Sequence, residues 1–464
     1  MKFEEFWEIY INEDILEIYD IIKEVFSEKI EKQVRKEYDI DEVLTEFIGH
    51  YRDAKEYSKI IEFTKILKAN NSGFYKEVLP YYNNFLIDYY CYHQKINELE
   101  EPIKDFLSSP LEDYDYLLMS LRKLIYYGHV ELGNKIIEGI YEKVRNSPIL
   151  IQGAEFDLAV FKYHIELERL YNNYLTKNEF NWTSYKEDLE KFDFEIRKEY
   201  ILLAEEGLKR NLEETEEKFS KEFLDSRLIS LEMLEKGFLR HMKEYKMPFP
   251  TSGSIWNYLY EYWENKRKGR NHRQYFQLEE RSFKAFLSEK SGFLLNYTFE
   301  IALILWGSSY VYDFLLLTKI IDREDYDNAA TLISNLKDEF IHENFSELWQ
   351  YSFIHEWKQS EMVSEVEKKR EKDLFEESYE SKEQTTEVNS TKGFSLELLS
   401  DIENTLHEFE QNIEGKRPKQ IKKISAKLGR NEKVTVKYKD GTIKNGVKFK
   451  RVKDDLEKGN CEIV

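Results

Sequence analysis

The chain has 464 residues and 41% hydrophobic residues, enough apolar content for two or three folded domains. It has only seven prolines and eighteen glycines, and 34% of its residues are charged, which favours long helices over a loop-rich β protein. The formal net charge of −21 argues against a general nucleic-acid binder.

Residues 1–246 carry an amphipathic helical pattern and are predicted to form a helical repeat-like domain. Polar breaks at 70–73, 108–110 and 146–148 predict turns between helices. Their spacing, about 35 to 40 residues, predicts stacked helical hairpins. Gly49 and Gly128 are each predicted to close the first helix of a hairpin, which resembles tetratricopeptide-type repeats. An irregular helical domain is the alternative.

The segment Met247–Ser254 contains two prolines and predicts a break, with Thr251 or Ser254 capping the next helix. Residues 255–369 are predicted to form a second helical domain. Within it, the uncharged run from Ile301 to Tyr312 is shorter than the roughly 20 apolar residues of a membrane-spanning helix. We therefore expect a buried helix, or a helical pair bent near Gly307, and no membrane span.

The composition becomes charged and polar after this domain. Residues 370–392 are rich in Ser, Thr, Glu and Gln, which predicts a flexible linker. Residues 393–413 regain a helical apolar stripe and predict one further helix.

The last segment, 427–464, changes to strand spacing. Apolar residues alternate at Val434, Val436 and Tyr438, and an Asp-Gly dipeptide follows, as in tight hairpins. The dipeptide Asn445-Gly446 predicts a bulge or a second turn, and Cys461–Val464 predicts a short returning strand. The fold class is thus mainly α, a helical-hairpin body with a small β-rich C-terminal module on a flexible linker.

Four parts of this module resemble the C-terminal tail of some bacterial SecA proteins, the ATPases of preprotein translocation: Gly429–Glu432, Val434–Thr442, Val447–Lys450 and Gly459–Val464. In many of those proteins the tail is a cysteine-rich zinc motif. Beyond Arg430 this chain has one cysteine and no histidine, so the resemblance is to a metal-free variant, and no zinc or other cofactor is expected. No phosphate-binding loop of the GxxxxGK[ST] type occurs, so the chain is not that ATPase.

Charge is segregated along the chain. Residues 416–451 hold fourteen Lys or Arg and two acids, a net charge of +12, which leaves −33 on the remainder. A basic module joined to an acidic body could bind an anionic partner, although a solvated basic face is an equally simple explanation. The predicted partner-binding residues are Arg430, Asn431, Lys433, Lys437, Lys448 and Lys450.

A second basic cluster lies in the helical body at Lys266, Arg267, Lys268, Arg270 and Arg273. It could bind phosphate or RNA, with Tyr275 and Phe276 nearby to stack on bases; a polar loop between helices is the simpler alternative. Two Arg–His pairs, Arg267 with His272 and Arg122 with His129, have the spacing found in some helical defence nucleases.

Metal and nucleophile motifs are incomplete. The His-Glu pairs at His342 and His355 lack a second histidine, and Glu339 with His342 matches only half of a di-iron pair. The two cysteines form no CxxC and fit a reducing cytoplasm. We expect a non-enzymatic cytoplasmic scaffold or adaptor that docks to a protein-targeting, chaperone or ribosomal partner. The alternatives are an RNA-contacting or phage-defence-type effector and an enzyme of unrecognised type.

Overall fold

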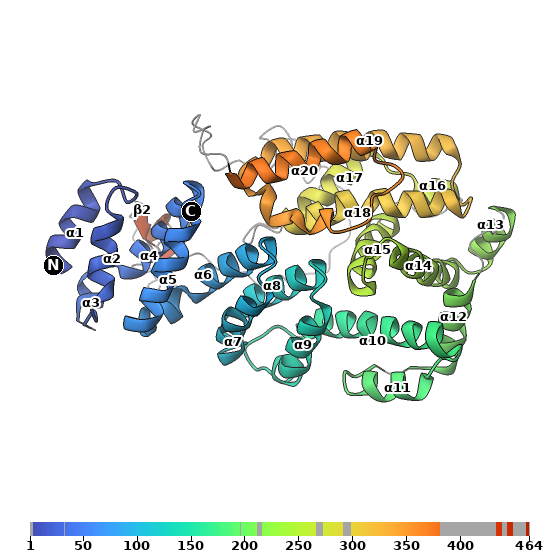
Figure 1. Cartoon of the computed structure of the whole chain (residues 1–464), viewed down its shortest axis with the longest axis horizontal. Helices are drawn as coiled ribbons and strands as arrows, with labels where there is room; N and C mark the ends of the chain where they lie inside the picture. Colours follow the sequence, from blue (N-terminus) through green and yellow to red (C-terminus); the bar gives the residue numbers. More distant parts are fainter. Residues whose placement is uncertain are drawn as a thin grey trace. The chain divides into compact units, whose positions relative to one another are not determined.

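The computed structural model describes residues 3–31, 33–194, 196–210, 216–265, 272–290, 298–380, 433–438, 443–448 and 461–463. Two units emerge from the pattern of contacts, Met1–Phe394 and Ser395–Val464. The first unit is helical (Figure 1). The second contains three short strands. The predicted mainly α fold is confirmed.

The helices of the first unit fall into three groups along the chain. The first group is α1 (Phe3–Asn12), α2 (Tyr19–Ser27), α3 (Val34–Glu37), α4 (Ile40–Asp53), α5 (Tyr57–Asn70), α6 (Ser72–Tyr92), η1 (Ile96–Leu99), α7 (Glu100–Ser108), α8 (Tyr114–Tyr126) and α9 (Val130–Arg145). The second is α10 (Phe156–Lys177), α11 (Trp182–Glu190), α12 (Lys198–Lys209), α13 (Glu216–Asp225) and α14 (Arg227–Glu244). The third is α15 (Phe249–Glu264), α16 (His272–Phe276), α17 (Glu280–Lys290), α18 (Thr298–Leu317), α19 (Arg323–Glu343), η2 (Phe345–His355) and α20 (Glu365–Glu380).

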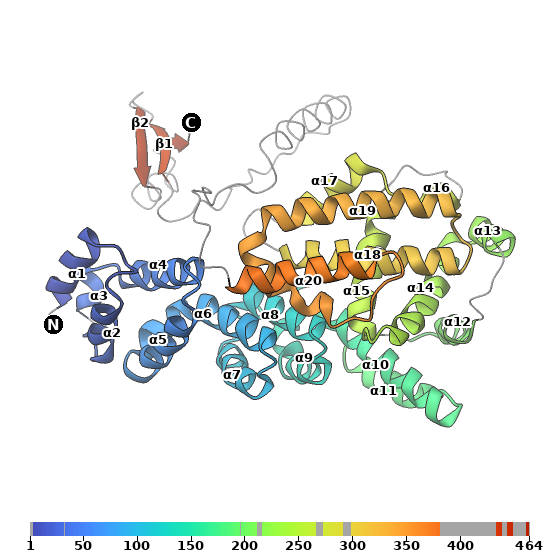
Figure 2. The ribbon, with the colours of Figure 1, turned by 45° about the horizontal axis from the view of Figure 1, so that its top comes forward.

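Three helical hairpins follow one another from α4 to α9 (Figure 2). In each hairpin the two helices pack together, and the first helices also pack in a row, α4 on α6 and α6 on α8. All three predicted turns fall at helix ends: α5 ends at Asn70, α7 at Ser108 and α9 at Arg145. The hairpin architecture predicted from the spacing of polar breaks is therefore confirmed.

The loops that close α4 and α8 share one backbone geometry. Lys55 has φ of 60° and Gly128 has φ of 83°. In both loops the next amide donates to a carbonyl five residues back, at 2.9 and 2.8 Å, which is a Schellman turn. Gly49 was predicted to close α4, but it lies inside that helix between buried Ile48 and Tyr51. That prediction is wrong, because the left-handed position is held by a lysine.

The same turn recurs elsewhere in the helical unit. It closes α6, α11, α14 and α18, at Gln94, Asp193, Lys246 and Lys319. Each of these positions has positive φ without being a glycine. Glycine positions in the sequence therefore could not locate most of these loops.

α15 starts inside the predicted break rather than after it. The helix begins at Phe249, and Pro250 occupies its first turn, where a missing amide costs no helical hydrogen bond. Thr251 or Ser254 was predicted to cap it, and that prediction is wrong, because both residues lie inside the helix. The Thr251 hydroxyl instead donates to the Ile125 carbonyl in α8, at 3.2 Å. The segment that was predicted to be a break therefore attaches α15 to α8.

The predicted domains at 1–246 and 255–369 form one unit. α15 packs against α8, α10 and α14 on one side of the break and against α18 on the other. The larger of two hydrophobic clusters runs from Phe6 to Phe375, across both predicted domains.

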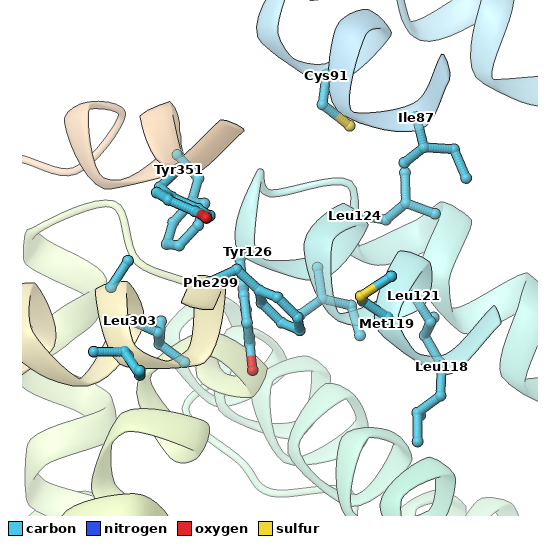
Figure 3. Packing of buried hydrophobic residues seen from close by; sticks show 14 of the residues in the cluster. Ile87, Cys91, Leu118, Met119, Leu121, Leu124, Tyr126, Phe299, Leu303 and Tyr351 are labelled. Atoms are coloured by element: carbon cyan, nitrogen blue, oxygen red, sulfur yellow. The ribbon is translucent and has the colours of Figure 1, made fainter. Parts of the chain in front are cut away.

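α18 lies at the centre of this core. Figure 3 shows Ile87 and Cys91 of α6 on one side of α8, and Phe299 and Leu303 of α18 on the other. α18 is one continuous helix through Gly307, so the buried-helix prediction is confirmed in its unbent form. Among the described residues, α18 is the one helix long and apolar enough to cross a membrane, and 89% of its most apolar stretch is buried in the helical unit.

The predicted linker at 370–392 begins inside a packed helix. We call η2 and α20, with the residues between them, the C-terminal helical segment (345–380). Its α20 extends to Glu380 and buries Phe375 and Ser378. The linker prediction is therefore wrong as far as Glu380, because these side chains contribute to the core. Residues 381–392 and the helix predicted at 393–413 lie outside the described residues.

The C-terminal helical segment packs against the first hairpins. The ring of Tyr379 lies 5.1 Å from that of Tyr57 and 4.7 Å from that of Tyr92, centroid to centroid. The Tyr379 hydroxyl lies 2.8 Å from Nε2 of His93, and Nζ of Lys55 donates to the Ser378 carbonyl. Residues about 300 positions apart are thus joined at one aromatic cluster.

Candidate functional site

The second unit contains an antiparallel sheet of β1 (Lys433–Tyr438), β2 (Ile443–Lys448) and β3 (Cys461–Ile463), in the order β2-β1-β3. Val434 pairs with Val447, but Val436 pairs with Lys444, so one residue of β1 opposes two of β2. This is a β-bulge, and it falls at the Asn-Gly dipeptide where a bulge was predicted.

The register places three predicted partner-binding residues at positions on one face of the sheet. Lys433 is directly opposite Lys448, and Lys437 lies four residues further along β1, on the same face. Val436, on the other face, is fully buried, whereas Lys437 is exposed. Across from Lys437 on β3 is Glu462. Like charges directly opposite each other destabilise a sheet, so sheet stability does not explain the pairing of Lys433 with Lys448.

The other predicted tail residues are placed less fully. Arg430, Asn431 and Lys450 lie outside the described residues. Lys444, which was not among the predicted binding residues, is exposed and has Nζ 4.8 Å from the ring centroid of Tyr438. The register places Lys444 and Tyr438 on the face of Val436, so this cation–π contact lies on the side of the sheet opposite to the predicted lysines.

Arg273 is the described member of the basic cluster in the helical body; Lys266, Arg267, Lys268 and Arg270 lie outside the described residues. Its guanidinium contacts the Asp322 carboxylate at 2.7 Å, next to the start of α19. Tyr275 and Phe276, predicted to stack on bases, are buried in the core, and Phe276 packs against Trp263 at 4.8 Å. The aromatic part of the RNA-binding prediction is therefore wrong.

The described Arg–His pair has internal partners. Arg122 donates to Glu300 and to Asp157, the latter at 3.0 Å. Burial lowers the pKa of His129. Arg122 therefore joins α8 to α10 and α18.

The incomplete metal motifs remain incomplete in space. The Glu339 carboxylate accepts from Lys284 at 2.9 Å. Within the described ranges, no group of three or more His, Cys, Asp or Glu side chains is placed to hold a metal ion.

Among the described residues of the helical unit, four lysines are almost wholly buried, each beside a carboxylate. Lys123 lies 2.6 Å from Asp88, Lys162 lies 2.7 Å from Glu166, and Lys236 lies 2.5 Å from Glu235. The fourth pair, Lys337 of α19 and Glu371 of α20, is 3.7 Å apart, and both side chains are at most 4% exposed. Burial lowers the pKa of Lys337 and raises that of Glu371.

A small polar cavity of about 30 Å³ adjoins this fourth pair, where α18, α19 and the C-terminal helical segment meet. Trp306 lies on its wall and donates from Nε1 to Oε2 of Glu371 at 2.8 Å. The lining side chains are Trp306, Ser309, Tyr310, Lys337, Ile354, His355, Trp357, Gln359, Ser360, Val363, Lys368 and Glu371. Such a volume admits water but no organic substrate.

Part of this chain resembles SecA. A segment of 85 residues is 42% identical to the protein translocase subunit SecA of Amoebophilus asiaticus (strain 5a2). The match covers 18% of this chain and only 7% of the length of that relative. No family model matches the chain. No solved structure matches it.

Sequence reasoning missed the cavity and its ion pair. Lys337 sits on the apolar stripe of α19 between Ile333 and Phe340, and a lysine at such a position is a usable signal. Glu371 gave no signal, because its surroundings were assigned to a linker.

Proposed function

We propose that this protein is a non-enzymatic helical scaffold or adaptor whose basic C-terminal module docks to a partner in protein targeting, to a chaperone or to the ribosome. The SecA similarity carries this proposal, because it relates 85 residues of this chain to a translocase that it otherwise does not resemble. We propose that the tail at 427–464 lies within the 85-residue segment that matches SecA. We also propose that the protein is cytoplasmic and that it has neither a membrane span nor a cofactor.

The sheet supports a docking role through its charge. Lys433, Lys437 and Lys448 share one face by register, which suits an anionic surface. The rest of the chain is strongly acidic. An anionic surface of a partner would therefore attract the basic face and repel the acidic body.

The alternative, an RNA-contacting or phage-defence-type effector, rests on the basic cluster from Lys266 to Arg273 together with the same basic tail. Binding to ribosomal RNA is compatible with both hypotheses. They differ in whether binding needs a defined protein partner or only phosphate. Phosphate-driven binding falls steeply with salt because bound counterions are released.

Binding to purified ribosomes, and to purified translocation and chaperone components, tests the proposal at low and moderate salt. Three proteins are compared: the full chain, a version ending at Glu380, and the full chain with Lys433, Lys437 and Lys448 all changed to Glu. The matched control changes the same three residues to Arg, which preserves the charge.

We expect one of these partners to bind the full chain and the Arg variant, and to lose at least tenfold in affinity with the other two proteins. Equal binding by the version ending at Glu380 would move the function to the helical body. Binding of unrelated RNA as tight as that of any protein partner would favour the effector instead.

A further inference from the structure

Buried polar atoms without a hydrogen-bond partner in the protein gather around the cavity beside Lys337 and Glu371. These atoms are Ser309 Oγ, His355 Nε2, Gln359 Oε1 and Glu371 Oε1. All four residues line the cavity, and the side chains come from α18, α20 and the region around the end of η2. Ser309 is 1% exposed and Glu371 is 3% exposed. A buried polar atom without a partner costs roughly 1–3 kcal/mol, so four of them around one space need an occupant.

The ion pair beside the cavity differs from its three counterparts. The other buried lysines contact their carboxylates at 2.5–2.7 Å, which is hydrogen-bonding distance. Lys337 Nζ is 3.7 Å from Glu371 Oε1, too far for a direct hydrogen bond. At this separation a water molecule lying beside the pair can hydrogen-bond to both charged groups.

The wall of the cavity selects against ions. Lys337 and Lys368 line it and disfavour a cation, while the oxygens of Gln359 and Glu371 disfavour an anion. His355 is neutral at ordinary pH, because burial lowers its pKa to about 3. An occupant must therefore be neutral, must both donate and accept hydrogen bonds, and must fit within about 30 Å³.

We propose that this cavity binds one or two ordered water molecules, which bridge Lys337 to Glu371 and hydrogen-bond to Ser309, His355 and Gln359. The waters join α20 to α18 and α19, so the C-terminal helical segment is held to the core through a hydrated ion pair. Water supplies the missing donors to Glu371 and Gln359 and accepts from the Lys337 ammonium group.

A high-resolution crystal structure of the full chain tests the proposal directly. We expect density for water within about 3.2 Å of Lys337 Nζ and Glu371 Oε1 and of at least one of the other three atoms. Diffraction from crystals pressurised with xenon tests whether the cavity is instead dry, since xenon enters dry apolar cavities. Xenon in the cavity, a bound ion, or direct contact between the two charged groups would each overturn the proposal.

A matched pair of variants, Ser309→Thr and Ser309→Val, adds a readout in solution. The two new side chains have nearly the same shape and differ in the hydroxyl. In a hydrated cavity Thr keeps a hydrogen bond to water, so we expect the Val variant to melt roughly 1–3 °C below the Thr variant. In a dry cavity Val would be at least as stable as Thr, because a buried unpartnered hydroxyl is unfavourable. That order of melting temperatures would also overturn the proposal.

Discussion

At the residue scale, Gly49 and Gly128 have different backbone conformations: Gly49 is helical, whereas Gly128 is left-handed. Gly49 lies inside α4, where glycine is less favourable than alanine, and a Cβ there would meet nothing within 4 Å. Gly128 has φ of 83°, a conformation that disfavours any residue with a Cβ. We expect Gly49→Ala to raise the free energy of unfolding by about 0.5–1 kcal/mol. Gly128→Ala should lower it by about 1–2 kcal/mol, and urea unfolding measures both.

Lys319→Gly serves as the reciprocal control. Lys319 is exposed and has φ of 59° at the end of α18, so glycine there relieves the strain of a left-handed lysine. An increase in stability is expected. If Gly128→Ala and Lys319→Gly changed stability in the same direction, the shared turn geometry would be wrong.

His355 makes stability depend on pH. Burial, reinforced by Lys372, Lys368 and Lys337, lowers its pKa from 6.5 to about 3. Below pH 6.5 the unfolded chain binds a proton that the folded chain does not, so stability falls as the pH drops from about 6.5 toward 3. For a group shifted this far the loss at pH 5, relative to pH 8, is about 2 kcal/mol. Urea unfolding at both pH values measures it.

The variant His355→Gln isolates this contribution. Burial also lowers the pKa values of His93, His129 and His241, so these groups act with the same sign, but they are present in both proteins. We expect the parent protein to lose more stability than the variant between pH 8 and pH 5. Identical losses would show that His355 titrates normally in the folded state.

At the scale of helices, Gly307 sets how closely α18 approaches α15. A Cβ at Gly307 would lie 2.6 Å from Cγ1 of Ile255, closer than real side chains come. We expect Gly307→Ala to destabilise the protein by about 1–3 kcal/mol through overpacking. Because Ile255→Ala removes the clashing atoms, the double variant should lose less stability than the sum of the two single losses.

Gly139→Ala in α9 is the control for this double-mutant cycle. Gly139 is exposed and helical, and a Cβ there meets nothing within 4 Å. Alanine should stabilise at this position by roughly 0.5–1 kcal/mol. Additive losses for Gly307 and Ile255 would mean that the two helices are not in close contact there.

Hydrophobic periodicity located the N-terminal hairpins because their buried faces are apolar. The same method failed for α20. The residues that it buries are Glu371, Phe375 and Ser378, spaced four and three apart as a helical stripe requires, but two of the three are polar. Their burial depends on Trp306, Lys337 and Trp349, which lie elsewhere in the chain. No local pattern could reveal it.

At the scale of the whole molecule, the sequence predicted the helical class but not the extent of the helical unit. Proline and composition mark local changes of direction, and both were taken as boundaries. The contacts that join the segments on either side of these predicted boundaries are long-range: Thr251 with Ile125, and Tyr379 with Tyr57 and Tyr92. The sequence also led to the basic tail residues, because charge segregation can be counted without knowing the fold.

Two versions of the chain test where the helical unit ends. A version ending at Glu380 keeps α20, and we expect its melting temperature to stay within about 2 °C of that of the full chain. A version ending at Ser364 lacks α20 and leaves Lys337 without Glu371, and breaking a buried ion pair costs about 3–5 kcal/mol. It also uncovers the core around Trp306 and Trp349, so we expect a much lower melting temperature or aggregation.

The comparison discriminates between a linker and a structural helix. If the version ending at Ser364 melted like the full chain, the C-terminal helical segment would contribute little to the core, and the linker would begin near residue 365 after all. If the version ending at Glu380 were also strongly destabilised, residues beyond Glu380 would pack on the helical unit. In that case the basic module could not be removed without disturbing the body, and loss of partner binding on truncation would no longer identify the docking surface. The variants with three Lys→Glu or Lys→Arg changes would then be the decisive comparison.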